Sequence, residues 1–159
     1  NDYYWRMNSR RMESQVVRDS LLHLTGKLDL TMGGPSIEPS PNARRRALYF
    51  LHSRDKQSKF LATFDDAEIL SCYERTESIV PQQALALSNA KVPLDVSEIL
   101  GKRGPKDNES YIRQVFSDIL CRPPTDEELQ ECLGFLKDIP KRSRLVHALL
   151  THNDFLTIR

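Results

Sequence analysis

The sequence predicts a mainly α, compact multi-helix domain with a short β element near residues 46–51 and an antiparallel helix pair at its C-terminal end. Three observations lead to this fold class. Apolar residues recur at helical spacing across 108–121. A capping box, Thr125-Asp-Glu-Glu128, opens another helix, and Pro81 stands where a further helix would begin. Because 159 residues match the length of one domain, we expect 1–159 to form a single domain.

The first elements along the chain are one helix and one long loop. Residues 9–24 place apolar side chains near a 3.6-residue period, and Gly26 supplies a stop signal. Residues 25–45 contain paired glycines and several prolines, which predicts a loop. The apolar run 46–51, which begins at the last of three consecutive arginines, is expected to be a short buried strand.

The later elements are expected to be helices separated by proline stops. A polar loop leads into the helix that ends at residue 89, with Val80 as its cap and Pro81 as its first residue. Pro123-Pro124 and Pro140 end two further helices. The predicted ranges are 75–89 for the loop and its helix, then 108–121, 126–138 and 142–152 for the C-terminal helices. Short connections between the last two helices favour an antiparallel pair.

Charge is unevenly distributed along the chain. Residues 1–60 hold 11 Lys and Arg against 6 Asp and Glu, residues 61–100 hold 2 against 7, and residues 101–159 hold 10 against 9. We therefore expect the basic first part to face the acidic middle part inside one fold. A nucleic-acid-binding domain would keep a basic excess overall, so nucleic acid is not the expected partner. No apolar run approaches the roughly 20 residues that span a bilayer.

Two polar motifs are candidate binding surfaces. One is the charged loop before Pro81 with the amides that follow it, because polar groups at a helix N-terminus can hold an anion. The other contains paired glycines, which let a backbone approach a ligand closely. The candidate residues are Arg75, Thr76, Glu77, Gln82, Gln83, Asp29, Gly33 and Gly34. The competing interpretation is structural: the glycines form a tight turn, and Glu77 clasps the basic N-terminal part through Arg18 or Arg46.

A catalytic alternative depends on two histidines that each have an aspartate close by in sequence. The pairs His52/Asp55 and His152/Asp154 would suit a divalent metal or acid–base chemistry if the fold brought them together. The structural interpretation, in which each histidine bonds locally, is favoured. The three cysteines, Cys72, Cys121 and Cys132, form no Cys-x-x-Cys spacing, and the chain lacks the Cys-x-x-Cys-His signature of covalent haem attachment.

Several motifs in fixed order resemble those of a known family. They are Trp5-Arg6-Met7-Asn8, Arg18-Asp19-Ser20-Leu21-Leu22, Leu28–Pro35, Arg46-Ala-Leu-Tyr49, Arg75–Ser78 with Val80–Leu85, Arg122–Thr125 with Glu128-Leu129, and Leu149-Leu150 with Asn153-Asp-Phe155. Together they resemble the C-terminal domain of planctomycete-type surface proteins, a family of unknown function. The resemblance covers nearly the whole chain, and each motif is weak when taken alone.

The resemblance implies a setting rather than a reaction. Such domains end large exported proteins of the cell envelope or extracellular space, often behind a cytochrome-like domain, so any haem would lie upstream and no cofactor is expected in this chain. We expect a C-terminal fragment of a larger protein, acting as a non-catalytic structural or binding module. It would dock on other domains of the parent protein, on a polysaccharide or on a surface protein. The alternative is a metal-dependent hydrolase or redox-associated enzyme domain that uses the two histidine–aspartate pairs.

Overall fold

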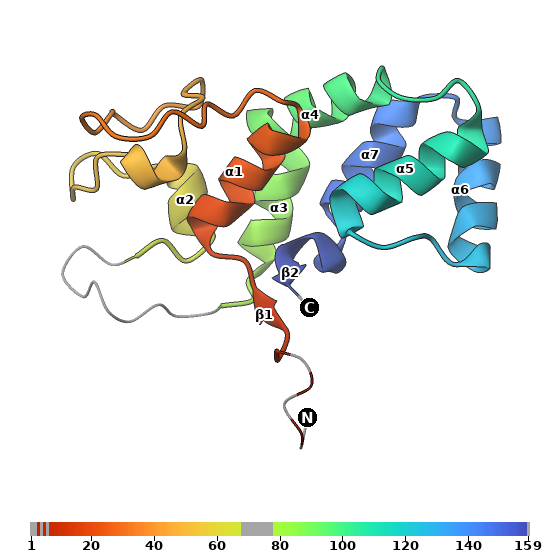
Figure 1. Ribbon diagram of the computed structural model, residues 1–159, viewed down its shortest axis with the longest axis horizontal. Coiled ribbons are helices and arrows are strands. Elements are labelled where there is room, and N and C mark those ends of the chain that lie inside the picture. The colour runs from red at the N-terminus through yellow and green to blue at the C-terminus, as the bar shows by residue number, and fades with distance from the viewer. Residues whose placement is uncertain (1–2, 4, 6, 68–77, 159) are drawn as a thin grey trace.

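The computed structural model describes residues 3, 5, 7–67 and 78–158, and this part of the chain is mainly helical, as predicted (Figure 1). Its elements follow in the order β1 (Arg10–Arg11), α1 (Ser14–Leu24), η1 (Ala47–Tyr49), α2 (Lys59–Thr63), α3 (Pro81–Asn89), α4 (Lys91–Gly101), α5 (Asn108–Leu120), α6 (Asp126–Asp138), α7 (Arg142–Leu150), η2 (Asn153–Leu156) and β2 (Thr157–Ile158). None of the described helices is long and apolar enough to cross a membrane.

Helix α4 connects the two halves of the domain. Helices α1, α2 and α3 lie on one side and α5, α6 and α7 on the other, and α4 contacts both α1 and α7 (Figure 1). The core consists of apolar side chains that these helices direct towards one another. Its most deeply buried members include Val17, Leu21, Leu87, Val96, Ile112, Val146 and Leu150. Their burial supplies the main stabilisation, at about 25 cal/mol per Å² of apolar surface removed from water.

Helix α4 was not predicted, because Pro93 and the neighbouring polar residues obscure its pattern. Pro93 is the third residue of the helix, and the first amides of a helix have no intrahelical partner, so the proline removes no bond. At its other end α4 packs closely on α7. A Cβ atom added at Gly101 would lie 2.7 Å from the backbone nitrogen of Ser143. Glycine is therefore required for this approach of two backbones.

The predicted start signals of α3 and α6 are confirmed, and α5 has a side-chain cap that was not predicted. Val80 has extended geometry and Pro81 begins α3. The Asp107 carboxylate accepts the Ser110 amide at the start of α5. At α6 the capping box is complete, since Thr125 Oγ1 accepts the Glu128 amide at 3.2 Å and Glu128 Oε2 accepts the Thr125 amide at 2.8 Å.

The predicted strand at 46–51 is wrong, although the fold does contain a short β element. Ala47–Tyr49 form a 3₁₀ turn, because the Ala47 amide donates to both carboxylate oxygens of Asp19 in α1, at 2.9 and 3.0 Å. This contact holds the segment against a helix, and Phe50 forms only an isolated bridge with Ile37. The two-stranded antiparallel sheet instead pairs Arg10 with Ile158 and Arg11 with Thr157.

Two predicted helix boundaries are corrected, one at each end of the chain. The first helix starts at Ser14 rather than near residue 9, because residues 10 and 11 pair with the C-terminal strand. The last helix ends at Leu150 rather than at 152. There His152 caps the 3₁₀ turn η2 by accepting the Asp154 amide. The helices α6 and α7 contact each other across a short connection.

Arg122 joins three elements at the end of α5. It donates to both oxygens of Glu128, at 2.7 and 2.8 Å, and to Asp154 of η2 at 3.2 Å. These hydrogen bonds, Arg122's above all, lower the pKa of Glu128 from its ordinary value to about 2. A carboxylate with a depressed pKa stabilises the fold above its unfolded pKa of about 4.3, and this stabilisation is lost as the pH falls through the folded pKa.

We expect Glu128→Gln to remove part of the acid sensitivity between about pH 4.3 and pH 2. Glutamine keeps the capping-box acceptor but not the charge, and the partly exposed pair contributes about 1 kcal/mol after solvent screening. Denaturant unfolding at a series of pH values measures how steeply the free energy of unfolding changes with pH. The neighbouring exposed Glu127, changed to Gln, is the matched control. Equal slopes for the two variants would contradict the assignment.

Candidate binding groove

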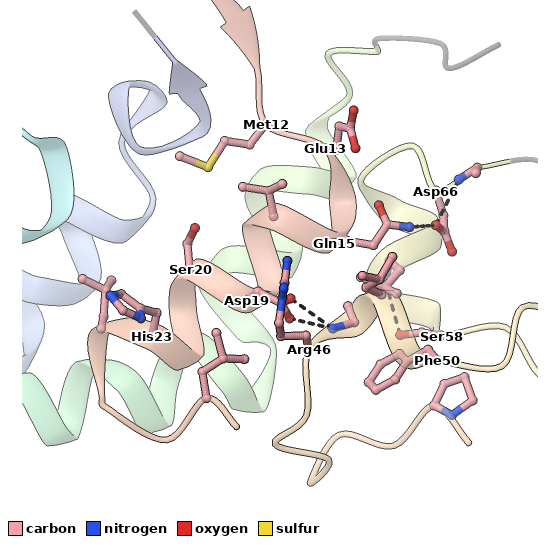
Figure 2. Close-up of a pocket in the computed structure, with 18 of the residues that line it drawn as sticks. Met12, Glu13, Gln15, Asp19, Ser20, His23, Arg46, Phe50, Ser58 and Asp66 are labelled. Carbon is pink, nitrogen blue, oxygen red and sulfur yellow. Dashed lines mark hydrogen bonds between the residues drawn. The ribbon is translucent and has the colours of Figure 1, made fainter. Parts of the chain in front are cut away.

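A large cavity lies between helix α1 and the chain that folds across it. It has a volume of about 790 Å³ and is lined mainly by α1 and by residues between Leu28 and Ala67 (Figure 2). We call it the α1 groove. Pockets of 300–1,000 Å³ are the size that small ligands or short peptide segments occupy.

Arg18 and Asp19 build the groove by fixing the long loop to α1. The Arg18 side chain is 4% exposed. It donates to the carbonyl oxygens of Ala43 and Arg45 and to Asp19, and it lies 4.4 Å from the ring centre of Phe50. Burial lowers the pKa of Arg18, although the Asp19 carboxylate opposes that shift. Asp19 in turn accepts the Ala47 amide, as Figure 2 shows.

The paired glycines form a turn that is held by Arg45 and Tyr49, as the structural interpretation predicted. The Gly33 amide donates to the Tyr49 hydroxyl at 2.8 Å, and Arg45 donates to the carbonyl oxygens of Gly33 and Pro35. Both glycines have positive φ, 77° at Gly33 and 87° at Gly34. Asp29 is also used locally, because its carboxylate accepts the Thr31 amide and hydroxyl.

The lining of the groove combines exposed apolar side chains with polar ones. Leu48 and Leu30 are 67% and 60% exposed, and Val16 is 40% exposed. These side chains line the cavity together with Met12 and Leu51. The polar lining residues include Glu13, Gln15, Ser20, His23, Arg46 and Asp66, and Figure 2 shows Gln15 of α1 donating to Asp66. An apolar centre with a polar edge is typical of surfaces that bind other molecules.

Gln83, a predicted exposed binding residue, is buried inside a second polar cluster. Its side chain is 3% exposed. The side-chain Nε2 of Gln83 donates to Asp65 and to the Ser78 carbonyl oxygen. Arg11 donates to the side-chain oxygen of Gln83 at 2.9 Å. Ser78 also donates to Asp65 through its amide and hydroxyl, at 2.8 and 2.6 Å. We call this cluster the Asp65 clasp.

The other candidates of that motif are placed differently. Gln82 is exposed at the start of α3, whereas Arg75, Thr76 and Glu77 lie outside the described residues. Glu77 was expected to hold Arg18 or Arg46. Arg18 instead pairs with Asp19, and the contact found for Arg46 is with the sulfur of Met32 at 3.8 Å. Ion pairs such as Arg18–Asp19 and Lys56–Glu38 form within the basic first part of the chain.

The histidine–aspartate pairs of the catalytic alternative are not assembled into one site. His52 Nδ1 lies 3.9 Å from Asp66 rather than beside Asp55. His152 caps η2 and lies 3.8 Å from the Asp154 carboxylate, which Arg122 also binds. Within residues 3, 5, 7–67 and 78–158, no group of three or more His, Cys, Asp or Glu side chains has the arrangement of a metal site.

A family model described as PSD1, protein of unknown function (DUF1553), matches residues 1–136. The chain belongs to this family. No match to this chain was found among the curated proteins or among the solved structures. The PSD1 match extends from the N-terminus into α6 and includes every residue that lines the α1 groove except Phe155.

Apart from His52, which lines the groove, the residues that build the groove of this PSD1 domain were not among the predicted site residues. Asp19 and Asp66 take their roles from partners distant in sequence, which no local pattern reveals. One signal was available. Val16 and Val17 are adjacent apolar residues on the same helix. Adjacent helical side chains point in different directions, so only one of the two is expected to reach the core. Val17 is buried, whereas Val16 faces the groove.

Proposed function

We propose that this PSD1 domain is a non-catalytic structural and binding module at the C-terminal end of a large exported surface protein of the planctomycete type. Its α1 groove receives a segment from another domain of the same protein. The observation that carries the proposal is the cluster of exposed apolar side chains, including Leu30 and Leu48, gathered in a cavity of about 790 Å³. Contiguous apolar surface with a polar rim marks interaction sites on soluble domains.

Charge and hydrogen bonding support docking rather than chemistry in this groove. The Asp19 and Asp66 carboxylates accept hydrogen bonds from the Ala47 amide and the Gln15 side chain, respectively. Both carboxylates therefore hold the walls of the groove in place. A rigid apolar groove with fixed walls loses little conformational entropy when a partner segment binds, which favours binding.

Replacing Leu48 with aspartate should weaken docking at least tenfold, which corresponds to about 1.4 kcal/mol. The side chain is 67% exposed, so the substitution leaves the stability within about 0.5 kcal/mol of the parent value. It nevertheless places a charge among the apolar side chains that line the groove. The measurement is calorimetric titration of the 159-residue domain with the separately produced remainder of the parent protein.

Leu85→Asp is the matched control, because Leu85 is 58% exposed on α3 and does not line the groove. Wild-type affinity for the control, together with weakened binding for Leu48→Asp, supports the proposal. Equal affinities for both variants would rule out the groove as the docking site. Binding to an extracellular molecule but not to the parent protein would assign the groove to an external ligand instead.

A further inference from the structure

Two basic loops meet at the end of the domain where α4, α5 and α7 converge (Figure 1). The α4–α5 loop carries Lys102, Arg103 and Lys106. Lys141 lies directly before α7, and Arg144 lies in its first turn. All five side chains are exposed. We call them the basic loop patch. It lies outside the α1 groove, whose lining contains none of these residues.

Arg142 ties the two loops together. Its guanidinium donates to the carbonyl oxygens of Pro105 and Lys106 and to Asn108 Oδ1, at 2.6 to 3.2 Å, and lies 4.2 Å from the ring centre of Tyr111. The close contact of Gly101 with Ser143 fixes the same junction. The exposed cations are therefore held together by the fold before any partner binds, which lowers the entropy cost of binding.

Acidic residues offset only part of this charge. Glu98 pairs with Lys141 at 3.3 Å and accepts the Ser143 hydroxyl, and the Asp107 carboxylate caps α5. Glu109 pairs with Arg113, and Asp138 is exposed at the end of α6. Lys102, Arg103, Lys106 and Arg144 form no ion pair within the described part of the chain.

We propose that the basic loop patch binds an acidic polysaccharide through the sulfate or carboxylate groups of the polymer. Nucleic acid fits less well, because single strands stack on exposed aromatic side chains, and the aromatic residue of this junction, Tyr111, is 1% exposed beneath Arg142. A peptide that docks through apolar side chains fits less well, because that mode needs apolar anchor pockets beside the charge, and a purely acidic peptide is the alternative that polyglutamate tests below. The small cavity here is lined by the charged Glu98, Lys102, Lys141 and Arg142, and its apolar lining residues are Pro140 and Leu136, which is only 4% exposed.

The test compares two variants that lose the same charge. Lys102→Gln/Arg103→Gln/Lys106→Gln removes three cations from the patch and leaves Arg142 in place. Arg44→Gln/Arg54→Gln/Lys59→Gln removes three exposed cations from the other half of the domain. Binding to heparin, polyglutamate and single-stranded DNA of matched charge is measured by calorimetry over a range of salt concentrations. Thermal melts check that both variants fold.

We expect wild-type protein to bind heparin more tightly than the other two polymers. The patch variant should lose at least tenfold in affinity, and the slope of log affinity against log salt should fall by about one per removed charge. The control variant should stay within about twofold. Equal losses in both variants, or no heparin binding at low salt, would overturn the proposal. Binding of DNA or polyglutamate as tight as that of heparin would overturn the assignment to polysaccharide.

Discussion

Arg18→Met should lower the free energy of unfolding by about 3–5 kcal/mol, the range for breaking a buried ion pair from one side. Methionine keeps much of the side-chain volume but provides no donor. Asp19 then loses its charged partner, and the carbonyl oxygens of Ala43 and Arg45 lose their donor. The stacking of Arg18 on Phe50 is also lost. Denaturant unfolding followed by circular dichroism measures the change.

Arg44→Met is the matched control for this prediction, because Arg44 lies in the same loop and is exposed. It should change stability by less than about 0.5 kcal/mol. Arg18→Lys should give an intermediate loss, since lysine keeps the charge but not the planar fork of donors. Limited proteolysis should cut the loop of residues 25–45 faster in Arg18→Met than in either of the other variants. Equal stability of Arg18→Met and Arg44→Met would show that Arg18 does not hold the loop.

Gly101→Ala should destabilise the domain by about 1–3 kcal/mol, the usual cost of overpacking a tight contact. The added methyl group would meet the backbone nitrogen, Cα and Cβ of Ser143 at 2.7, 2.8 and 2.9 Å. Backbone atoms cannot swing aside as a flexible side chain can, so α4 and α7 would have to separate. Because α4 also contacts α1, the damage should extend to both halves of the core.

Gly134→Ala is expected to have the opposite effect on the stability of the domain. Gly134 lies inside α6, and no atom lies within 4 Å of a Cβ added there. Alanine should therefore stabilise the domain by up to about 1 kcal/mol through helix propensity alone. The two substitutions add the same methyl group and differ in sign. A stabilising Gly101→Ala would contradict the close approach of α4 and α7.

Elements with local signals could be predicted from the sequence, and elements decided by distant partners could not. The start of α6 needs only Thr125 and Glu128, three residues apart, and the start of α3 needs only Pro81 and the residue before it. The apolar run at 46–51 instead takes its shape from Asp19, which lies 28 residues before Ala47. Strand β1 depends on pairing with Thr157 and Ile158 at the other end of the chain.

The same distinction applies to the candidate site. The sequence identified polar motifs around Gly33 and Gln83, and both occur in structural roles: the turn held by Arg45 and the Asp65 clasp. It did not identify the α1 groove, because a cavity arises from the packing of α1 against a loop that carries no periodic pattern. Val16 and Leu48 belong to apolar runs that resemble core sequence, and only their exposure in the folded chain makes them candidates for binding.

Amide hydrogen exchange, compared between the isolated domain and the intact parent protein, tests the central claim most directly. If the α1 groove receives a segment of another domain, exchange in the parent protein should slow along residues 12–24 and 44–58, which supply most of the groove lining. The exposed face of α6 should exchange equally in both forms. Unchanged exchange across both groove segments, or slowing confined to α6, would contradict the proposed docking function.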